Sequence, residues 1–521
     1  MKRIITITAL LIAVFIAGSC TKDVTKLPQN AATVNTYFQT SKDITSALSG
    51  MYGSFLSTMV STGGTNGGGS NNYFAWGETR SDNFAPSGYP TTATENINNN
   101  AILNNNASAD WAGLYQTISR ANLNIANIPN VPKYDNTVTQ TAVNTAMAQC
   151  YAMRAECYFY IARVWGGGPM WTAPYLDPNS PGIKPRVSEQ VLIDSVIIPD
   201  LNKAYALIPK SQQPTVWYIG EGAICAIAAD VYMWRAGAPV ASAPNGPVSG
   251  PIGGLSDYQT AITWIQRLFL SRAPSGTGPA YAGTSAANIE STATWKNVFL
   301  NPPSSLEAIW SLNWDETVNG CACIPISIQN SNNPYRVDGG LYVNWPLNTA
   351  DIRVKQTFDP TVTGTAAGTH TLKYFNVANE AALTATIGGA ISFNVYAVMN
   401  RLSDVYLTYA EALNQTGDLP NALKYLNFIH QRAGLPAILA SAVPNTATMQ
   451  AAILQERQWE LFAEGKRWFD LVRTNTVSAV MSPILVGRGF APFTDLNKDY
   501  WPISITAINA NGLLTQNYNY H

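Results

Sequence analysis

Charged side chains are scarce in this chain. Asp, Glu, Lys and Arg make up only 12% of the 521 residues, about half the usual share, and 31 Lys and Arg nearly balance 32 Asp and Glu. A nucleic-acid binder needs an excess of basic side chains to neutralise phosphates, so the composition argues against this class of function. The chain is instead 46% hydrophobic and 11% aromatic, which excludes a disordered or coiled-coil protein. Its many Asn, Thr, Ser, Tyr and Trp residues suit a neutral, hydroxyl-rich ligand.

Histidine and cysteine are also rare. The chain has three histidines, His370, His430 and His521, which argues against a clustered zinc site. Cys150 and Cys157 lie seven residues apart on one predicted helix, about 10 Å along its axis, too far to form a disulfide. We expect most cysteines to be buried core residues. The sequence leaves the disulfide state of Cys321 and Cys323 open, and identifies no partners with which they could bind a metal.

A long apolar run occurs only at the N-terminus. Lys2 and Arg3 precede the apolar residues 4–17, which are followed by small residues and Cys20. This order is typical of an export signal and is too short for a membrane-spanning helix. Because a single cysteine follows the small residues, the segment resembles a bacterial lipoprotein signal. We predict a signal peptide over 1–19, lipidation of Cys20, a tether over 20–35 and a single domain over 36–521. An ordinary secretory signal is the alternative, since Ala17 stands where the lipoprotein pattern usually has Leu.

Helical periodicity dominates the rest of the chain. Apolar residues recur at three- and four-residue spacing after Arg401, and a second amphipathic segment follows Gly417 at once. This pair spans 401–435, close to the period of a tetratricopeptide repeat, and must stack on other pairs to bury its apolar faces. We predict a mainly α fold, a tetratricopeptide-like scaffold of helix pairs with minor β structure. The predicted helices span about 43–56, 111–128, 145–165, 188–208, 221–269, 401–435 and 447–473.

Two long segments lack this periodicity. Residues 61–106 and 273–391 are rich in Gly, Asn, Thr and Pro with scattered aromatic residues, and the second contains short alternating runs that could be strands. Loops of this length are usually functional, so we predict that both face the ligand.

Residues 456–473 (ERQWELFAEGKRWFDLVR) closely resemble the C-terminal signature of the SusD/RagB family of outer-membrane lipoproteins. Residues 154–159, 401–414 and the C-terminal segment from Trp501 also look like this family, and so does the N-terminus. The resemblance implies a non-catalytic, lipid-anchored protein of the cell surface and outer membrane. Such a protein binds glycans and covers a SusC-like TonB-dependent transporter. Capture of peptides, also found in the family, is the first alternative.

A sugar presents an apolar face and a hydroxyl rim, so a glycan site needs exposed rings beside amide, carboxylate or guanidinium groups. The first long segment offers both in one stretch, and the family's order of binding loops agrees with it. Further aromatic residues lie in the second segment, although each alone is more often a core residue. The predicted ligand-binding residues are Tyr73, Trp76, Arg80, Asp82, Asn83, Tyr89, Trp314, Tyr335 and Trp345.

Three glutamates, Glu456, Glu460 and Glu464, recur every four residues on one predicted helix. Two carboxyl groups at such a spacing could in principle hydrolyse a glycosidic bond, and a surface glycoside hydrolase is the second alternative. Interleaved arginines instead favour structural ion pairs that keep the carboxylates ionised. We therefore predict no catalytic residue, no enzyme activity, no cofactor and no catalytic metal.

One weak cation motif remains. Asp495, Asn497 and Asp499 place oxygen atoms at positions 1, 3 and 5, as an EF-hand loop does. The later glycine and glutamate of that motif are missing, so a capped turn is favoured over a structural Ca²⁺ site.

Overall fold

The computed structural model describes most of the chain from residue 37 onward. The described ranges are 37–60, 71–87, 91–177, 179, 182–210, 215–241, 243–271, 281–283, 285–315, 335–345, 350–359, 361, 371–376 and 395–520. The predicted signal peptide, the lipidation site Cys20, the tether, Tyr89, Cys321 and Cys323 lie outside these ranges. Within them, no helix is both long and apolar enough to cross a membrane.

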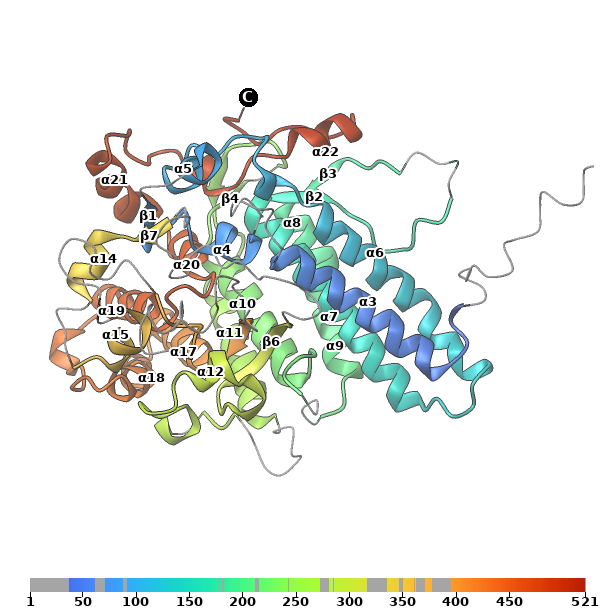
Figure 1. The fold of residues 1–521 in the computed structure, drawn as a ribbon, viewed down its shortest axis with the longest axis horizontal. Coiled ribbons are helices and arrows are strands. Elements are labelled where there is room, and N and C mark those ends of the chain that lie inside the picture. The colour runs from blue at the N-terminus through green and yellow to red at the C-terminus, as the bar shows by residue number, and fades with distance from the viewer. Residues whose placement is uncertain are drawn as a thin grey trace, which may run out of the picture.

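The described chain is mainly helical, which confirms the predicted fold class (Figure 1). The long helices are α3 (Ser41–Met59), α6 (Ala112–Asn127), α7 (Gln140–Trp165), α9 (Ile198–Leu207), α10 (Glu221–Gly237), α11 (Leu255–Leu270), α17 (Leu402–Gln415), α18 (Leu419–Arg432), α19 (Thr446–Glu460) and α21 (Val477–Gly487). The shorter helices are α4 (Asn72–Gly77), α5 (Thr92–Asn98), α8 (Glu189–Leu192), α12 (Asn297–Leu300), α14 (Gly339–Asn344), α15 (Ile352–Thr357), α20 (Arg467–Arg473) and α22 (Ile505–Ala510). A π-helical turn, Ile193–Ile197, joins α8 to α9.

Consecutive helices pack against each other along the chain. α3 contacts α6, α6 contacts α7, and α7 contacts α9; the series continues through α10 and α11 to α17, α18 and α19. In Figure 1 the first four of these helices lie on the right and the last three on the lower left. Helix ends follow local signals: Thr139 caps α7 by accepting from Ala142 N, and Gly166 ends it with a positive φ of 69°.

The strands form four small antiparallel pairs. They are β1 (Phe84–Pro86) with β7 (Tyr335–Val337), β2 (Gly167–Pro169) with β3 (Arg186–Ser188), β4 (Val240–Ala241) with β5 (Val248–Gly250), and β6 (Ala308–Trp314) with β8 (Val395–Arg401). In the longest pair Ala308 lies opposite Arg401 and Trp314 opposite Val395, with an irregular register at Trp310. The two segments predicted as binding loops are therefore not loops throughout, because α4, β1 and α5 lie in the first and α12, β6, β7, α14 and α15 in the second.

The core is continuous across the helical scaffold and the strand pairs. Cys150, Cys157 and Cys225 are buried in it as free thiols, as expected for core cysteines. The interior also contains many charged groups. One group links α15, β8, α18 and α19, where Glu460 accepts from Arg353 at 3.0 Å, Arg401 at 2.6 Å and Arg432 at 2.5 Å. Glu464 pairs with Arg401 and Lys373, and Glu456 with Arg353 and His430. Structural ion pairing of the three glutamates is thus confirmed.

A buried carboxyl of α7 makes stability depend on pH. Burial raises the pKa of Glu156 to about 7, although Arg163, at 3.9 Å, acts in the opposite direction. Between its usual value near 4.5 and about 7, the folded chain holds a proton that the unfolded chain has released. The free energy of unfolding therefore falls as the pH rises through this window.

We expect Glu156→Gln to remove this contribution. Relative to the parent, the variant should gain free energy of unfolding between pH 5 and pH 7, by at most about 3 kcal/mol. Urea unfolding of both proteins at several pH values measures the difference, with Glu95→Gln on the exposed face of α5 as a control. A difference that is equal at pH 5 and pH 7 would contradict the assignment.

Candidate functional site

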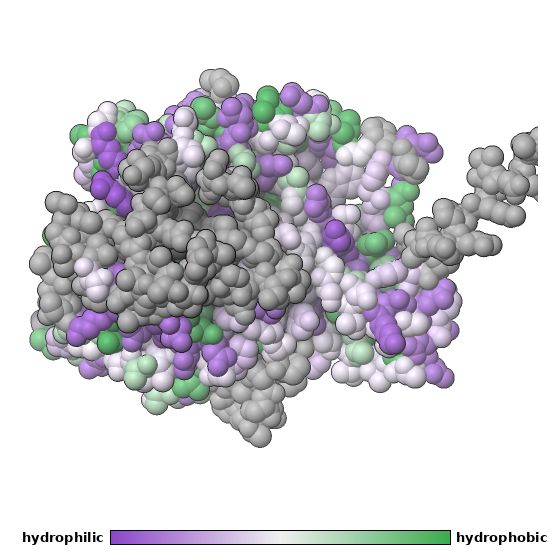
Figure 2. Space-filling view, in the orientation of Figure 1, coloured by the Kyte–Doolittle hydropathy of each residue, from purple (hydrophilic) through white to green (hydrophobic). Residues whose placement is uncertain are grey.

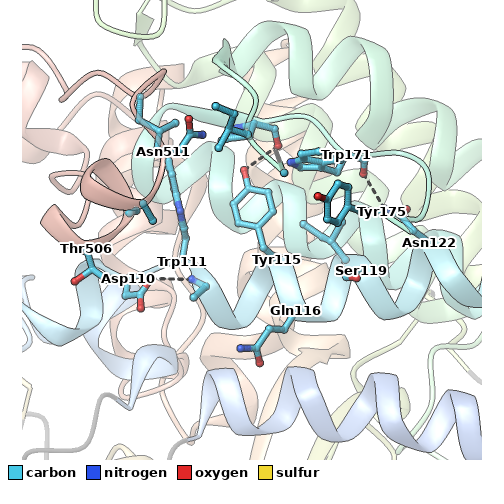
Figure 3. A pocket seen from close by; sticks show the side chains of 18 of the residues that line it. Asp110, Trp111, Tyr115, Gln116, Ser119, Asn122, Trp171, Tyr175, Thr506 and Asn511 are labelled. Carbon is cyan, nitrogen blue, oxygen red and sulfur yellow. Dashed lines mark hydrogen bonds between the residues drawn. The ribbon is translucent and has the colours of Figure 1, made fainter. Parts of the chain in front are cut away.

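A cavity of about 530 Å³ lies between three segments that are distant in the sequence. They are α6 with Asp110 before it, residues 169–175 and 182–183 between the end of β2 and β3, and α22 with the residues after it. We call this cavity the aromatic pocket, because Trp111, Tyr115, Trp171 and Tyr175 line it. Figure 3 shows the rings of Tyr115, Trp171 and Tyr175 above α6, with Thr506 and Asn511 on the side of α22.

Buried polar groups hold the backbone that carries Trp171. The Tyr158 hydroxyl accepts from Trp171 N at 2.6 Å and donates to Trp171 O at 2.8 Å. Asn122 Nδ2 donates to Trp171 O at 3.1 Å. Arg154 in turn donates to Asn122 Oδ1 at 2.6 Å and to Thr172 O at 2.9 Å, and it is fixed by two bonds to Asp200. The helical scaffold therefore fixes the backbone that carries the Trp171 ring, as a preformed binding site requires.

The glycines after α7 allow this arrangement. The Tyr115 hydroxyl donates to Pro169 O at 2.9 Å, across the face of Gly168. A Cβ atom at Gly168 would lie 2.5 Å from the Tyr115 hydroxyl, so only glycine fits below this ring. Burial raises the pKa of Tyr115 well above its usual range, which keeps the hydroxyl neutral. On the α22 side of the pocket, Asn511 Nδ2 donates to Lys184 O at 2.9 Å and so links the end of α22 to the segment before β3.

Two rings of the pocket are accessible to a ligand. Tyr175 is 44% exposed and Trp171 is half-buried, and the two rings meet edge to face at a centroid distance of 5.8 Å. Lys184 Nζ lies 4.2 Å from the centre of the Trp171 ring. In Figure 2 the upper edge of the molecule, where Figure 1 places α22, carries both hydrophobic and hydrophilic residues.

Polar groups surround these rings. Asp110, Gln116, Ser119, Thr506 and Asn511 line the pocket, and Asp110 is the one ionisable acid or base among the described lining residues, apart from the tyrosine hydroxyls. Asp110 Oδ1 accepts from Ala112 N at 2.9 Å. Aromatic faces beside amides and hydroxyls, with little charge, match the two surfaces of a sugar ring.

The residues that the sequence analysis predicted as ligand contacts lie elsewhere. Eight of the nine are described, and all eight are buried: Tyr73, Trp76, Arg80, Asp82, Asn83, Trp314, Tyr335 and Trp345. The expectation that these rings are exposed is therefore wrong in this conformation. Contact of these positions with a ligand stays a prediction, and the ninth residue, Tyr89, lies outside the described ranges.

The physical reason for their burial is that the fold itself uses their polar groups. Trp76 Nε1 donates to Ser108 O at 2.8 Å, and Trp345 Nε1 donates to Asp351 at 3.0 Å. The Arg80 guanidinium stacks on Trp468 at 3.7 Å and donates to two carbonyl oxygens.

The fold also uses the polar groups of Asp82 and Asn83. Asp82 accepts two bonds from Arg467, at 2.8 and 2.7 Å, and Asn83 donates to Glu78 at 2.6 Å. The first predicted binding segment is thus joined to residues 456–473.

The pocket residues were not predicted because they lie in a shorter aromatic segment than residues 61–106 and 273–391. A shorter signal of the same kind was present: Trp171 and Tyr175 lie in a Pro-rich polar stretch directly after the glycines that end α7. The weak cation motif forms the capped turn that the sequence favoured, with Asp495 Oδ1 accepting from Asn497 N at 3.0 Å. In the described part of the chain, no group of three or more His, Cys, Asp or Glu side chains could hold a metal ion.

Comparison with known proteins agrees with this architecture. The model described as "SusD family" matches residues 343–520, and the model described as "Starch-binding associating with outer membrane" matches residues 29–233. SusD-like protein P38 of Formosa agariphila is 26% identical to this chain over 555 aligned positions, covering 98% of each chain.

Solved structures show the same fold. A SusD superfamily protein from Bacteroides fragilis has a TM-score of 0.72 at 20% identity, covering 93% of this chain and 100% of the other. A laminarin-binding SusD-like protein has a TM-score of 0.67 at 18% identity, covering 92% and 100%. The two family models between them match both the N-terminal helices and the C-terminal signature, and the chain therefore belongs to the SusD/RagB family.

Proposed function

We propose that this protein is a non-catalytic, cell-surface glycan-binding lipoprotein that captures oligo- or polysaccharide in the aromatic pocket. The observation that carries the proposal is the pair of accessible rings, Trp171 and Tyr175, held on a rigid backbone beside hydroxyl and amide groups. The apolar face of a sugar stacks on such rings, and its hydroxyls bond to the surrounding polar side chains. The description of a matching family model as starch-binding, and the laminarin-binding structural neighbour, support the same ligand class.

Low charge distinguishes this proposal from peptide capture. A peptide brings ionised termini and side chains. To meet them the pocket offers one carboxylate among its described lining residues and one ammonium group, Lys184, beside the Trp171 ring. Binding of a neutral glycan should accordingly depend little on salt concentration.

The structure gives no support for glycan hydrolysis by Glu456, Glu460 and Glu464, whose spacing is compatible with a catalytic pair of carboxyl groups. Burial alone would raise the pKa of Glu460, but Arg432, Arg401 and Arg353 together lower it well below its usual value. A general acid needs a raised pKa, so Glu460 cannot donate a proton to a leaving group near neutral pH. We infer that the protein releases the bound glycan without cleaving it.

The remaining parts of the proposal follow from the family. The SusD-like family associates with the outer membrane, and Cys20 would carry the lipid that anchors this chain there. The captured glycan would then pass to a SusC-like TonB-dependent transporter as the partner protein.

The function is tested by affinity electrophoresis of the mature protein in gels that contain starch, laminarin or other polysaccharides. We expect at least one glycan to retard the protein. After incubation with that glycan, chromatography should show no shorter products. Shortened chains would establish an enzyme instead, and binding to a peptide library without binding to any glycan would establish the peptide alternative.

A further inference from the structure

A second cavity lies on the other side of α6. It measures about 550 Å³ and is bounded by α3 and α6; we call it the polar groove. Gly50, Gly53 and Ser57 of α3 face Gln116 and Arg120 of α6 across it, and Asn72 of α4 also lines it. No aromatic residue is among its described lining residues, in contrast to the aromatic pocket.

The two cavities adjoin each other at the start of α6. Asp110 and Gln116 line both of them. Figure 3 shows Gln116 extending from α6 towards α3, away from the ring of Tyr115. From Gly113 to Arg120 the groove follows α6 for roughly 10 Å, the rise of seven helical residues. A chain of linked sugars that starts in the aromatic pocket can therefore continue into the groove.

A buried acceptor in the groove lacks a partner. Asn72 is 6% exposed, and its Nδ2 donates to Thr58 O at 2.9 Å, while its Oδ1 has no hydrogen-bond partner in the described structure. Leaving a buried acceptor without a donor is unfavourable, so such atoms call for an external donor. A sugar hydroxyl supplies one. Arg120 and Gln116 are exposed and make no hydrogen bond or ion pair within the described residues, which leaves their donors available to sugar oxygens.

The floor of the groove is open at Gly53, where a larger side chain would fit without a steric clash. Gly53 lies inside α3, where glycine is less favourable than alanine. A Cβ atom at Gly53 would meet nothing within 4 Å, so packing does not explain the glycine. Because Gly53 has no side chain, the space in the polar groove stays available to a ligand.

We propose that the polar groove is a second glycan subsite, so that one sugar chain occupies the aromatic pocket and the groove together. This inference rests on the proposed function. The groove offers hydrogen bonds but no stacking surface, and because water competes for those hydrogen bonds, the groove without the aromatic pocket cannot bind a glycan. The protein then prefers chains of several sugars to disaccharides.

Gly53→Leu tests the subsite by filling the groove with a good helix former, and Gly53→Ala is the matched control that leaves it open. Arg120→Ala removes a donor from the opposite wall. Calorimetry with maltohexaose and laminarihexaose, each against its disaccharide, gives the affinities. For a hexasaccharide that the parent binds, we expect Gly53→Leu and Arg120→Ala to lose about tenfold or more in affinity, and Gly53→Ala to lose nothing. Disaccharide affinity should be unchanged in all three.

Unchanged hexasaccharide affinity in both Gly53→Leu and Arg120→Ala would overturn the inference. Trp171→Ala separates this failure from that of the proposed function. If Trp171→Ala weakens both chain lengths while the groove variants do not, the aromatic pocket binds glycan and the groove does not. If Trp171→Ala weakens neither, the assignment of the aromatic pocket fails as well.

Discussion

Replacing both Trp171 and Tyr175 with alanine is expected to reduce glycan affinity by about 30- to 900-fold. Each ring covers the apolar face of a sugar, and the area that it removes from water contributes about 1–2 kcal/mol. The backbone of this segment is held by Asn122, Arg154 and Tyr158, none of which is changed, so the fold should persist. Calorimetry with the glycan identified by affinity electrophoresis measures the loss, and circular dichroism checks the fold.

Tyr134→Ala is the matched control for this variant. Tyr134 is 65% exposed, more than Tyr175, and it does not line the aromatic pocket. The control should bind like the parent. Equal affinity of the double variant and the parent would show that the glycan binds elsewhere, and equal losses in the variant and the control would show that exposed tyrosines act non-specifically.

Glu460→Gln is expected to lower the free energy of unfolding by about 3–5 kcal/mol. The carboxylate is fully buried and accepts from three arginines, Arg353, Arg401 and Arg432. Neutralising it leaves these guanidinium groups close together with one negative charge fewer, and breaking a buried charge network in this way is strongly destabilising. Urea unfolding at pH 7 measures the loss.

The exposed Glu95 again supplies the comparison. Glu95→Gln on α5 should change the free energy of unfolding by less than about 1 kcal/mol, because surface charges contribute little. If Glu460→Gln cost no more than this, the network would not stabilise the fold, and the ion-pair assignment of the glutamates would lose its energetic basis.

The helical scaffold could be predicted because its signals are local. The apolar stripe of 401–435 recurs within one or two turns, and Gly417 and Asp418 mark the boundary between two helices, where Asp418 caps α18 through Asn421 N. Such patterns need no knowledge of distant residues. The pairing of β6 with β8 is different, since Ala308 meets Arg401 across some ninety residues that carry no local sign of the contact.

The candidate site could be predicted only as a type of surface. Composition indicated aromatic residues among neutral polar ones, and the aromatic pocket has such a lining. Which aromatic residues remain accessible is decided by long-range partners. Asp82 is buried because Arg467 reaches it from the C-terminal signature, and Trp76 because Ser108 accepts its indole proton. Trp171 stays accessible because Asn122 and Tyr158 bind its backbone instead of its ring.

A crystal structure of the protein soaked with its glycan tests the account most directly. Sugar rings should lie against Trp171 and Tyr175 in the aromatic pocket, with hydroxyls bonded to the side chains around Asp110 and Gln116. A glycan bound instead beside β1 and β7, near Tyr335 and Trp345, would contradict the account and return the site to the segments that the sequence alone had favoured.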